Sequence, residues 1–210
     1  MLDAVKAHLT PELIGKAANM YAETELGISK TIHSLLPTIF VGLLEKSGDS
    51  HAIDGLFNAL RGFSSTTKAP LDPLLLSEKN SNNSVVSVFL DTLFGAKAPA
   101  ISNAVAAFAG VKQSTVIALL PIAGTLAMHL LQQKITAEKL NPSGMVRYLL
   151  TQKNILMSLL PAGVAALLGV SNASGQFYGA ESSSGLPWWL WIVLLVLGLA
   201  TVILLGMQFF

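Results

Sequence analysis

The sequence contains no cysteine and little charge. Without cysteine, the chain cannot form a disulfide framework, a thiolate metal site, an iron–sulfur cluster or a cysteine nucleophile. Charged residues make up 12% of the 210 residues, whereas soluble domains usually carry about 25%. Thirteen Lys and Arg stand against twelve Asp and Glu, a formal net charge of +1. No basic excess therefore points to a nucleic-acid partner.

Sequence motifs of common chemistries are also missing. The chain has no GxxxxGK[ST], GxGxxG or GxSxG motif, so nucleotide binding and α/β-hydrolase chemistry lose their usual signals. The four histidines are far apart, and none forms an HxxxH or HxH pair that would place two metal ligands together: His8, His33, His51 and His129. We expect no catalytic residue, no metal site, no cofactor and no small-molecule substrate, and we interpret the protein as a non-enzyme.

The acidic residues give no pattern of paired carboxylates. Glu23 and Glu25 lie two apart, so on a helix they would point to different faces. We assign them, with Asp49 and Asp54, to solvated surface. An enzyme without recognisable motifs is an alternative that a ligand-filled polar pocket would favour.

A long uncharged stretch lies near the end of the chain. Residues 186–206 read LPWWLWIVLLVLGLATVILLG, without a charge. A helix of this length spans roughly 31 Å, which matches the bilayer core of about 30 Å. Trp188, Trp189 and Trp191 cluster at its start, where indole rings favour the membrane interface. The stretch predicts one transmembrane helix. The alternative, a helix buried in a large core, is disfavoured because helices of soluble proteins rarely lack a polar face.

The distribution of basic residues predicts the orientation of this span. The first residues carry Asp3 and Lys6 and lack the apolar core of a signal peptide. All thirteen basic residues precede the span, which by the positive-inside rule leaves the body in the cytoplasm. We expect a single-pass protein of the bacterial inner membrane, tail-anchored as the sequence stands, with residues 207–210 as a short periplasmic tail.

Residues 1–170 predict an all-α cytoplasmic domain, because no stretch of strict alternation competes with helical spacing. Capping residues and glycines set the expected bounds. The first helix is expected from Thr10 to about Leu26, closed by Gly27. A second follows over 30–46 after a Ser29 cap, and a third over 51–61 after Asp49 or Ser50.

A further group of helices follows residues 63–86, which are rich in Ser, Thr, Asn and Pro and predict a linker or long surface loop. Helical spacing then covers 85–95, 99–109 and 113–134. Thr136 and Asn141 mark two more helix starts, and a last helix is expected from Asn154 to Gly169. Residues 171–185 predict a flexible tether to the membrane.

The tripeptide Leu-Leu-Pro occurs three times, more often than this composition predicts by chance. Its copies are Leu35, Leu36 and Pro37; Leu119, Leu120 and Pro121; and Leu159, Leu160 and Pro161. Gly27 and Gly110 stand upstream of the first two copies, each expected to close a helix. We predict an internal repeat of two related units, 10–62 and 87–168. Each proline either kinks a helix or begins one, and such kinks either shape packing or form a hinge or groove.

Several segments resemble a known family. Leu150-Thr151-Gln152-Lys153-Asn154-Ile155, Leu160-Pro161-Ala162-Gly163 and Leu167-Leu168-Gly169 resemble the closing motif of the bacterial domain of unknown function 937, the YidB-like family. Leu93-Phe94-Gly95 through Ala109-Gly110-Val111 to Leu120-Pro121 is also similar. The resemblance covers most of residues 10–170 and is strongest over 93–169.

This resemblance implies a compact multihelical array and brings no established catalytic residues. In some relatives such a domain precedes a tryptophan-rich membrane helix and an OmpA-like domain that binds peptidoglycan. Pro187-Trp188-Trp189 fits that order. No OmpA-like sequence follows within this chain, so wall binding is not carried over.

Two functional hypotheses follow. The first is a membrane-anchored, non-enzymatic binding or scaffold protein related to the cell envelope, whose helical body contacts a protein partner or self-assembles. Its basis is that the body is poor in charge even without the span, so that apolar surface needs covering. The second is a multi-span or pore-forming membrane protein, with the uncharged stretches 113–133 and 154–170 also inserted. Polar residues in the first stretch and Pro161 in the second disfavour insertion.

Overall fold

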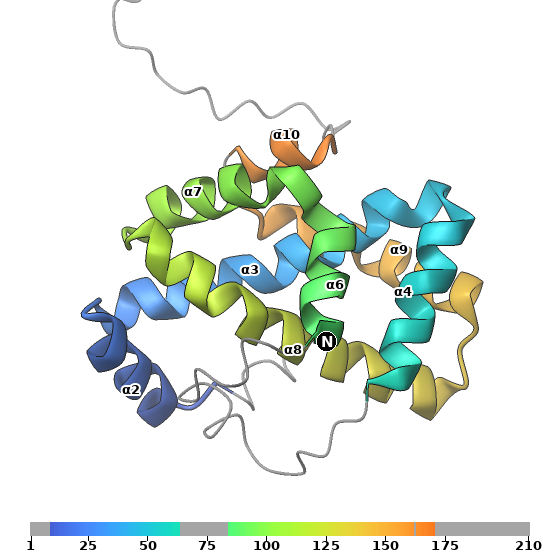
Figure 1. Cartoon of the computed structure of the whole chain (residues 1–210), viewed down its shortest axis with the longest axis horizontal. Coiled ribbons are helices and arrows are strands. Elements are labelled where there is room, and N and C mark those ends of the chain that lie inside the picture. Colours follow the sequence, from blue (N-terminus) through green and yellow to red (C-terminus); the bar gives the residue numbers. More distant parts are fainter. Residues whose placement is uncertain (1–8, 64–83, 162, 171–210) are drawn as a thin grey trace, which may run out of the picture. The chain divides into compact units, whose positions relative to one another are not determined.

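The computed structural model describes residues 9–63, 84–161 and 163–170, and every regular element in them is a helix (Figure 1). The all-α prediction is confirmed. The α-helices are α2 Pro11–Tyr21, α3 Glu25–Glu45, α4 Ser50–Gly62, α6 Ser84–Phe94, α7 Ala98–Ala109, α8 Gln113–Glu138, α9 Pro142–Ser158 and α10 Val164–Leu168. Two single 3₁₀ turns, η1 Lys46–Gly48 and η3 Gly95–Lys97, join neighbouring helices.

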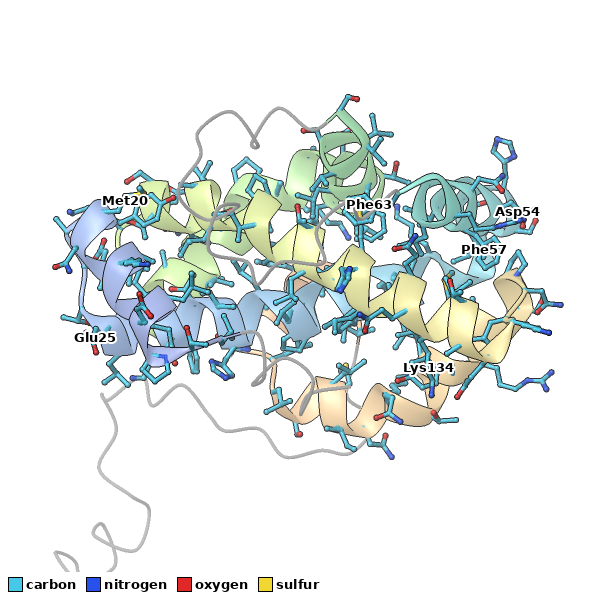
Figure 2. All side chains as sticks on the ribbon, turned by 90° about the horizontal axis from the view of Figure 1, so that it is seen from below. Met20, Glu25, Asp54, Phe57, Phe63 and Lys134 are labelled. Carbon is cyan, nitrogen blue, oxygen red and sulfur yellow. The ribbon has the colours of Figure 1, made fainter. Side chains whose placement is uncertain are left out.

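Helix α3 lies at the centre of the fold. Every side chain from 34 to 44 is buried, as expected of a helix that is apolar on all sides. Helices α2, α6, α7, α8, α9 and α10 all contact it, and both views show it between α8 and α9 (Figures 1 and 2). The core is therefore built around one helix, whose own sequence supplies its central layer.

Polar side chains inside α3 are satisfied by the helix itself. The hydroxyls of Thr31, Ser34 and Thr38 donate to the carbonyl oxygens four residues earlier, at 2.8, 2.6 and 2.7 Å. Such bonds remove the cost of burying a hydroxyl without a partner. No buried side-chain nitrogen or oxygen of the described residues lacks a hydrogen-bond partner. The helix can therefore be buried on all sides without an uncompensated polar group.

The boundary between the first two helices differs from the prediction. Helix α2 ends at Tyr21, and Ala22 follows in the left-handed conformation with φ of 50°. The Thr24 hydroxyl then accepts a hydrogen bond from the Gly27 amide at 3.0 Å and caps α3. The assignments of Gly27 as a helix end and Ser29 as a cap are wrong. Gly27 lies in the first turn of α3, where a Cβ would come within 2.7 Å of Val111 Cγ1.

Capping residues predicted some helix starts correctly and others wrongly. Asp49 caps α4 through the Ala52 amide at 3.1 Å, and Asn141 caps α9 through the Gly144 amide at 2.8 Å, as predicted. Thr136 and Asn154 were wrongly expected to start helices, since they lie inside α8 and α9. Helix α8 instead ends where Lys139 adopts φ of 50°.

Some predictions cannot be compared with the structure. The residues 64–83 of the expected linker, the tether 171–185, the span 186–206 with Trp188, Trp189 and Trp191, and the tail 207–210 lie outside the described residues. At the edge of the linker, residues 84–86 form the first turn of α6 and not a loop.

Three described stretches are long and apolar enough to cross a membrane, judged by length and composition alone: Glu25–Gly48, Ser84–Ala109 and Gln113–Glu138. In the first and third, 78% and 61% of the most apolar window is buried inside the fold, against 33% in the second. The second stretch, Ser84–Ala109, changes direction between α6 and α7 (Figure 1). The apolar surfaces of α3 and α8 are thus largely covered by protein.

The stretch 154–170, which the multi-span hypothesis inserts in the membrane as one helix, is not a single helix. Helix α9 ends at Ser158 and α10 begins at Val164, with Gly163 at φ of 89° between them. The expectation of a continuous last helix from Asn154 is wrong, because the Pro161 ring and this glycine conformation interrupt the backbone ladder.

Candidate contact surface

Two helix-to-helix turns meet at one end of the fold. Residues 22–24 join α2 to α3, and residues 110–112 join α7 to α8. One carboxylate oxygen of Glu23 accepts from the Lys112 amide at 2.9 Å and from the Thr115 hydroxyl at 3.0 Å. The Lys112 ammonium donates to the Ala22 carbonyl at 3.5 Å. These bonds tie the two turns into one unit, which we call the turn end.

Glu23 acts as the cap of a helix distant in sequence. Helix α8 has no side-chain cap of its own at Lys112, and the free amides of a helix start favour an acceptor and a negative charge. The hydrogen bond from the Lys112 amide is the main reason that the pKa of Glu23 lies below its ordinary value. The Thr115 hydroxyl and the Lys112 charge lower this pKa further, while desolvation opposes them.

This interaction predicts a pH-dependent contribution to stability. A carboxylate whose pKa is lowered by folding stabilises the protein above the pKa of the unfolded chain, and loses that effect as the pH falls through the folded pKa. Wild type should therefore be more stable than Glu23→Gln at neutral pH, and the two should converge in acid. Thermal unfolding from pH 7 to pH 3 measures this difference. Glu25→Gln is the control, and a difference between wild type and Glu23→Gln that is independent of pH would contradict the capping role.

The turn end also carries exposed apolar side chains from four helices. Met20, Leu26, Phe108 and Ile117 lie close to one of its two turns, and each is at least half exposed, Leu26 to 65%. Figure 2 shows Met20 and Glu25 at the same end of the body, opposite Phe57 and Lys134. Single exposed apolar residues are ordinary on protein surfaces. Four of them around one fixed pair of turns make this end the candidate contact surface.

The three Leu-Leu-Pro copies do not share one environment. Leu35, Leu36 and Pro37 lie in the buried middle of α3, and Leu119, Leu120 and Pro121 lie inside α8. The third copy lies in the turn between α9 and α10, with Leu159 exposed, Leu160 half-buried and Pro161 buried. The first two prolines are therefore interior to long helices, whereas the third precedes a helix.

The glycines upstream of the first two copies also differ. Gly110 ends α7 at φ of 71°, as expected, whereas Gly27 lies within α3. Gly27 and Gly110, which the proposed repeat matches to each other, therefore have different roles in the two units. The internal repeat stays a prediction.

The described residues contain no group of three or more His, Asp or Glu side chains that could hold a metal ion.

Two of the acidic residues assigned to solvated surface cap helices: Glu23 caps α8 and Asp49 caps α4. The role of Asp49 was also predicted from its position before a helix. That of Glu23 was missed, and the available signal was the lack of a capping side chain just before Gln113.

Residues 3–134 match the family described as bacterial protein of unknown function (DUF937). No curated protein and no solved structure matches the chain. The match ends within α8, so the motif at 150–169 on which the resemblance partly rested lies beyond it. It covers more than half of the sequence and includes the central helix α3 and both turns of the turn end. The chain belongs to this family of bacterial proteins of unknown function.

Proposed function

We propose that the protein is a membrane-anchored, non-enzymatic binding or scaffold protein of the bacterial inner membrane, whose cytoplasmic helical body contacts a protein partner or another copy of itself through the turn end. The observation that carries the proposal is the set of exposed apolar side chains there, next to two turns that Glu23 and the close approach of Gly27 to Val111 join. A rigid apolar surface costs little ordering entropy when it binds.

Burial energetics make such a contact worthwhile. Full burial of a Leu or Ile side chain contributes about 1.5–3 kcal/mol, so covering Leu26 and Ile117 alone would strengthen an association by at least tenfold. The sequence supports the proposed membrane anchor and the cytoplasmic location of the body. The uncharged residues 186–206 would anchor the body to the lipid bilayer, and the basic residues before them favour a cytoplasmic body.

Substituting glutamine at the turn end is expected to weaken the association. Leu26→Gln with Ile117→Gln replaces two exposed apolar side chains by polar ones that suit a helix. Val88→Gln with Leu150→Gln makes the same change on α6 and α9, at residues 61% and 50% exposed. The full chain would be extracted from native membranes in a neutral detergent. Its complexes would be weighed by light scattering and identified by mass spectrometry.

The first pair should lower the fraction of chain in complexes at least tenfold at a fixed concentration, and the control pair should leave it unchanged. A wild-type chain that purifies alone as a monomer would contradict the proposal. So would equal losses in both pairs, because they would show that the turn end has no special part.

The multi-span or pore-forming alternative is kept because three described stretches have the length and hydropathy of membrane spans. Deleting residues 186–210 separates it from the anchored-body proposal. An anchored body should yield a soluble, helical and monodisperse truncation, because α3 and α8 bury their apolar faces against each other. A truncation that still requires detergent would instead support insertion of the body.

A further inference from the structure

An open cleft lies at the other end of α8 from the turn end. The last turns of α4 and α8 and the turn leading into α9 enclose about 470 Å³, within the range of roughly 300–1,000 Å³ usual for small-molecule sites. Helix α8 has 26 residues, which at about 1.5 Å per residue separates its two ends by roughly 39 Å. The cleft is thus independent of the proposed contact surface.

Two positively charged side chains line this cleft. Arg61 comes from the last turn of α4 and Lys139 from the end of α8. Within the described residues, neither forms an ion pair. Glu138 is paired with Lys134, and Asp54, on the same face of α4 as Arg61, lies about two helical turns away from it and does not line the cleft. Among the described residues, the charged side chains that line the cleft are therefore both positive.

The remaining walls combine apolar surface with neutral polar groups. Phe57, Ile135 and Pro142 supply apolar surface, while Thr136 and Asn141 bring a hydroxyl and an amide. The cleft therefore offers both cationic groups and apolar surface to one ligand. Five of the nine residues that line it are polar or charged, so it suits a ligand in which a charged group is joined to a small apolar one.

We propose that this cleft binds the phosphate monoester group of an organic molecule that carries an apolar substituent. Two cations match the charge of about −1.5 to −2 that a phosphate monoester carries at pH 7, whereas a carboxylate carries one. The planar guanidinium of Arg61 can hold two phosphate oxygens at once, and Lys139 adds a point charge. The phosphate group can come from a soluble metabolite or from the headgroup of phosphatidic acid, and both share this chemistry.

Phenyl phosphate is the first probe, titrated by calorimetry into the full-length protein in a neutral detergent. It should bind with saturation, and more tightly than inorganic phosphate, which lacks the apolar group, or benzoate, which carries a single charge. Dioctanoyl phosphatidic acid should displace it. If the lipid competes at lower concentration than phenyl phosphate itself, the headgroup is the natural source. The reverse order indicates a soluble ester.

The double variant Arg61→Gln and Lys139→Gln should weaken phenyl phosphate binding at least tenfold. Both residues are exposed, so the fold should persist, which circular dichroism checks. The matched control is Arg147→Gln with Lys153→Gln on α9, which removes the same charge outside the cleft and should leave affinity unchanged. Equal weakening in both double variants, or no binding of phenyl phosphate at millimolar concentration, would overturn the proposal.

Discussion

Replacing Phe40 by alanine is expected to lower the free energy of unfolding by about 3–5 kcal/mol. Phe40 lies in the middle of α3 with no exposed surface, and the neighbouring side chains from 34 to 44 are also buried. Removing its ring loses the burial of a large apolar surface and leaves a cavity that the surrounding helices can close only in part. A loss of this size is a large fraction of the 5–15 kcal/mol typical of a domain.

Phe108→Ala provides a matched comparison, because Phe108 is half exposed on α7. The same substitution there should lower the free energy of unfolding by less than about 1 kcal/mol, because surface substitutions usually change it by no more than about 0.5 kcal/mol. Denaturant unfolding followed by circular dichroism would measure both variants in the same detergent. Equal losses in the two variants would mean that α3 is not the centre of the core.

A helix over 30–46 was predicted from local signals, whereas its place at the centre of the core was not predicted. Residues 34–44 contain no charge, and a helix without a polar face must be buried somewhere. The caps Asp49 and Asn141 were recognised because a capping side chain and its target amide lie three residues apart. Such features depend on a few neighbouring residues and are not changed by tertiary packing.

The candidate contact surface could not be predicted in the same way. Glu23 lies 89 and 92 residues from its hydrogen-bond partners Lys112 and Thr115, and nothing near it in the sequence indicates a helix start that needs a cap. The repeated tripeptide Leu-Leu-Pro, in turn, does not predict which of its copies are buried. Leu35 and Leu159 stand in the same short motif, yet one is fully buried and the other is 42% exposed, because tertiary packing and not the tripeptide decides burial.

Gly27 shows how a local sequence signal and tertiary packing can oppose each other at one position. Glycine near a helix end is usually a stop signal, but here it lies in the first turn of α3, which Thr24 caps, and the α7–α8 turn passes close to it. A Cβ at this position would lie 2.7 Å from Val111 Cγ1 and 3.0 Å from the Thr24 hydroxyl oxygen. In an open helix, Gly→Ala stabilises by about 0.5–1 kcal/mol. Here that gain opposes overpacking, which costs about 1–3 kcal/mol.

Gly27→Ala is therefore expected to destabilise the protein by about 1 kcal/mol, the middle of the overpacking range less the middle of the helix gain. Gly55→Ala, in α4 with no atom within 4 Å of the new Cβ, should stabilise it by about 0.5–1 kcal/mol. Chemical unfolding of both variants, and of a double-mutant cycle with Val111→Ala, tests the cause. Removing the Val111 methyl groups should recover most of the loss at Gly27, because it removes the atom in the way. An additive cycle would show that the two turns do not press on each other at Gly27, and the turn end would then be held by the hydrogen bonds of Glu23 and Lys112 alone.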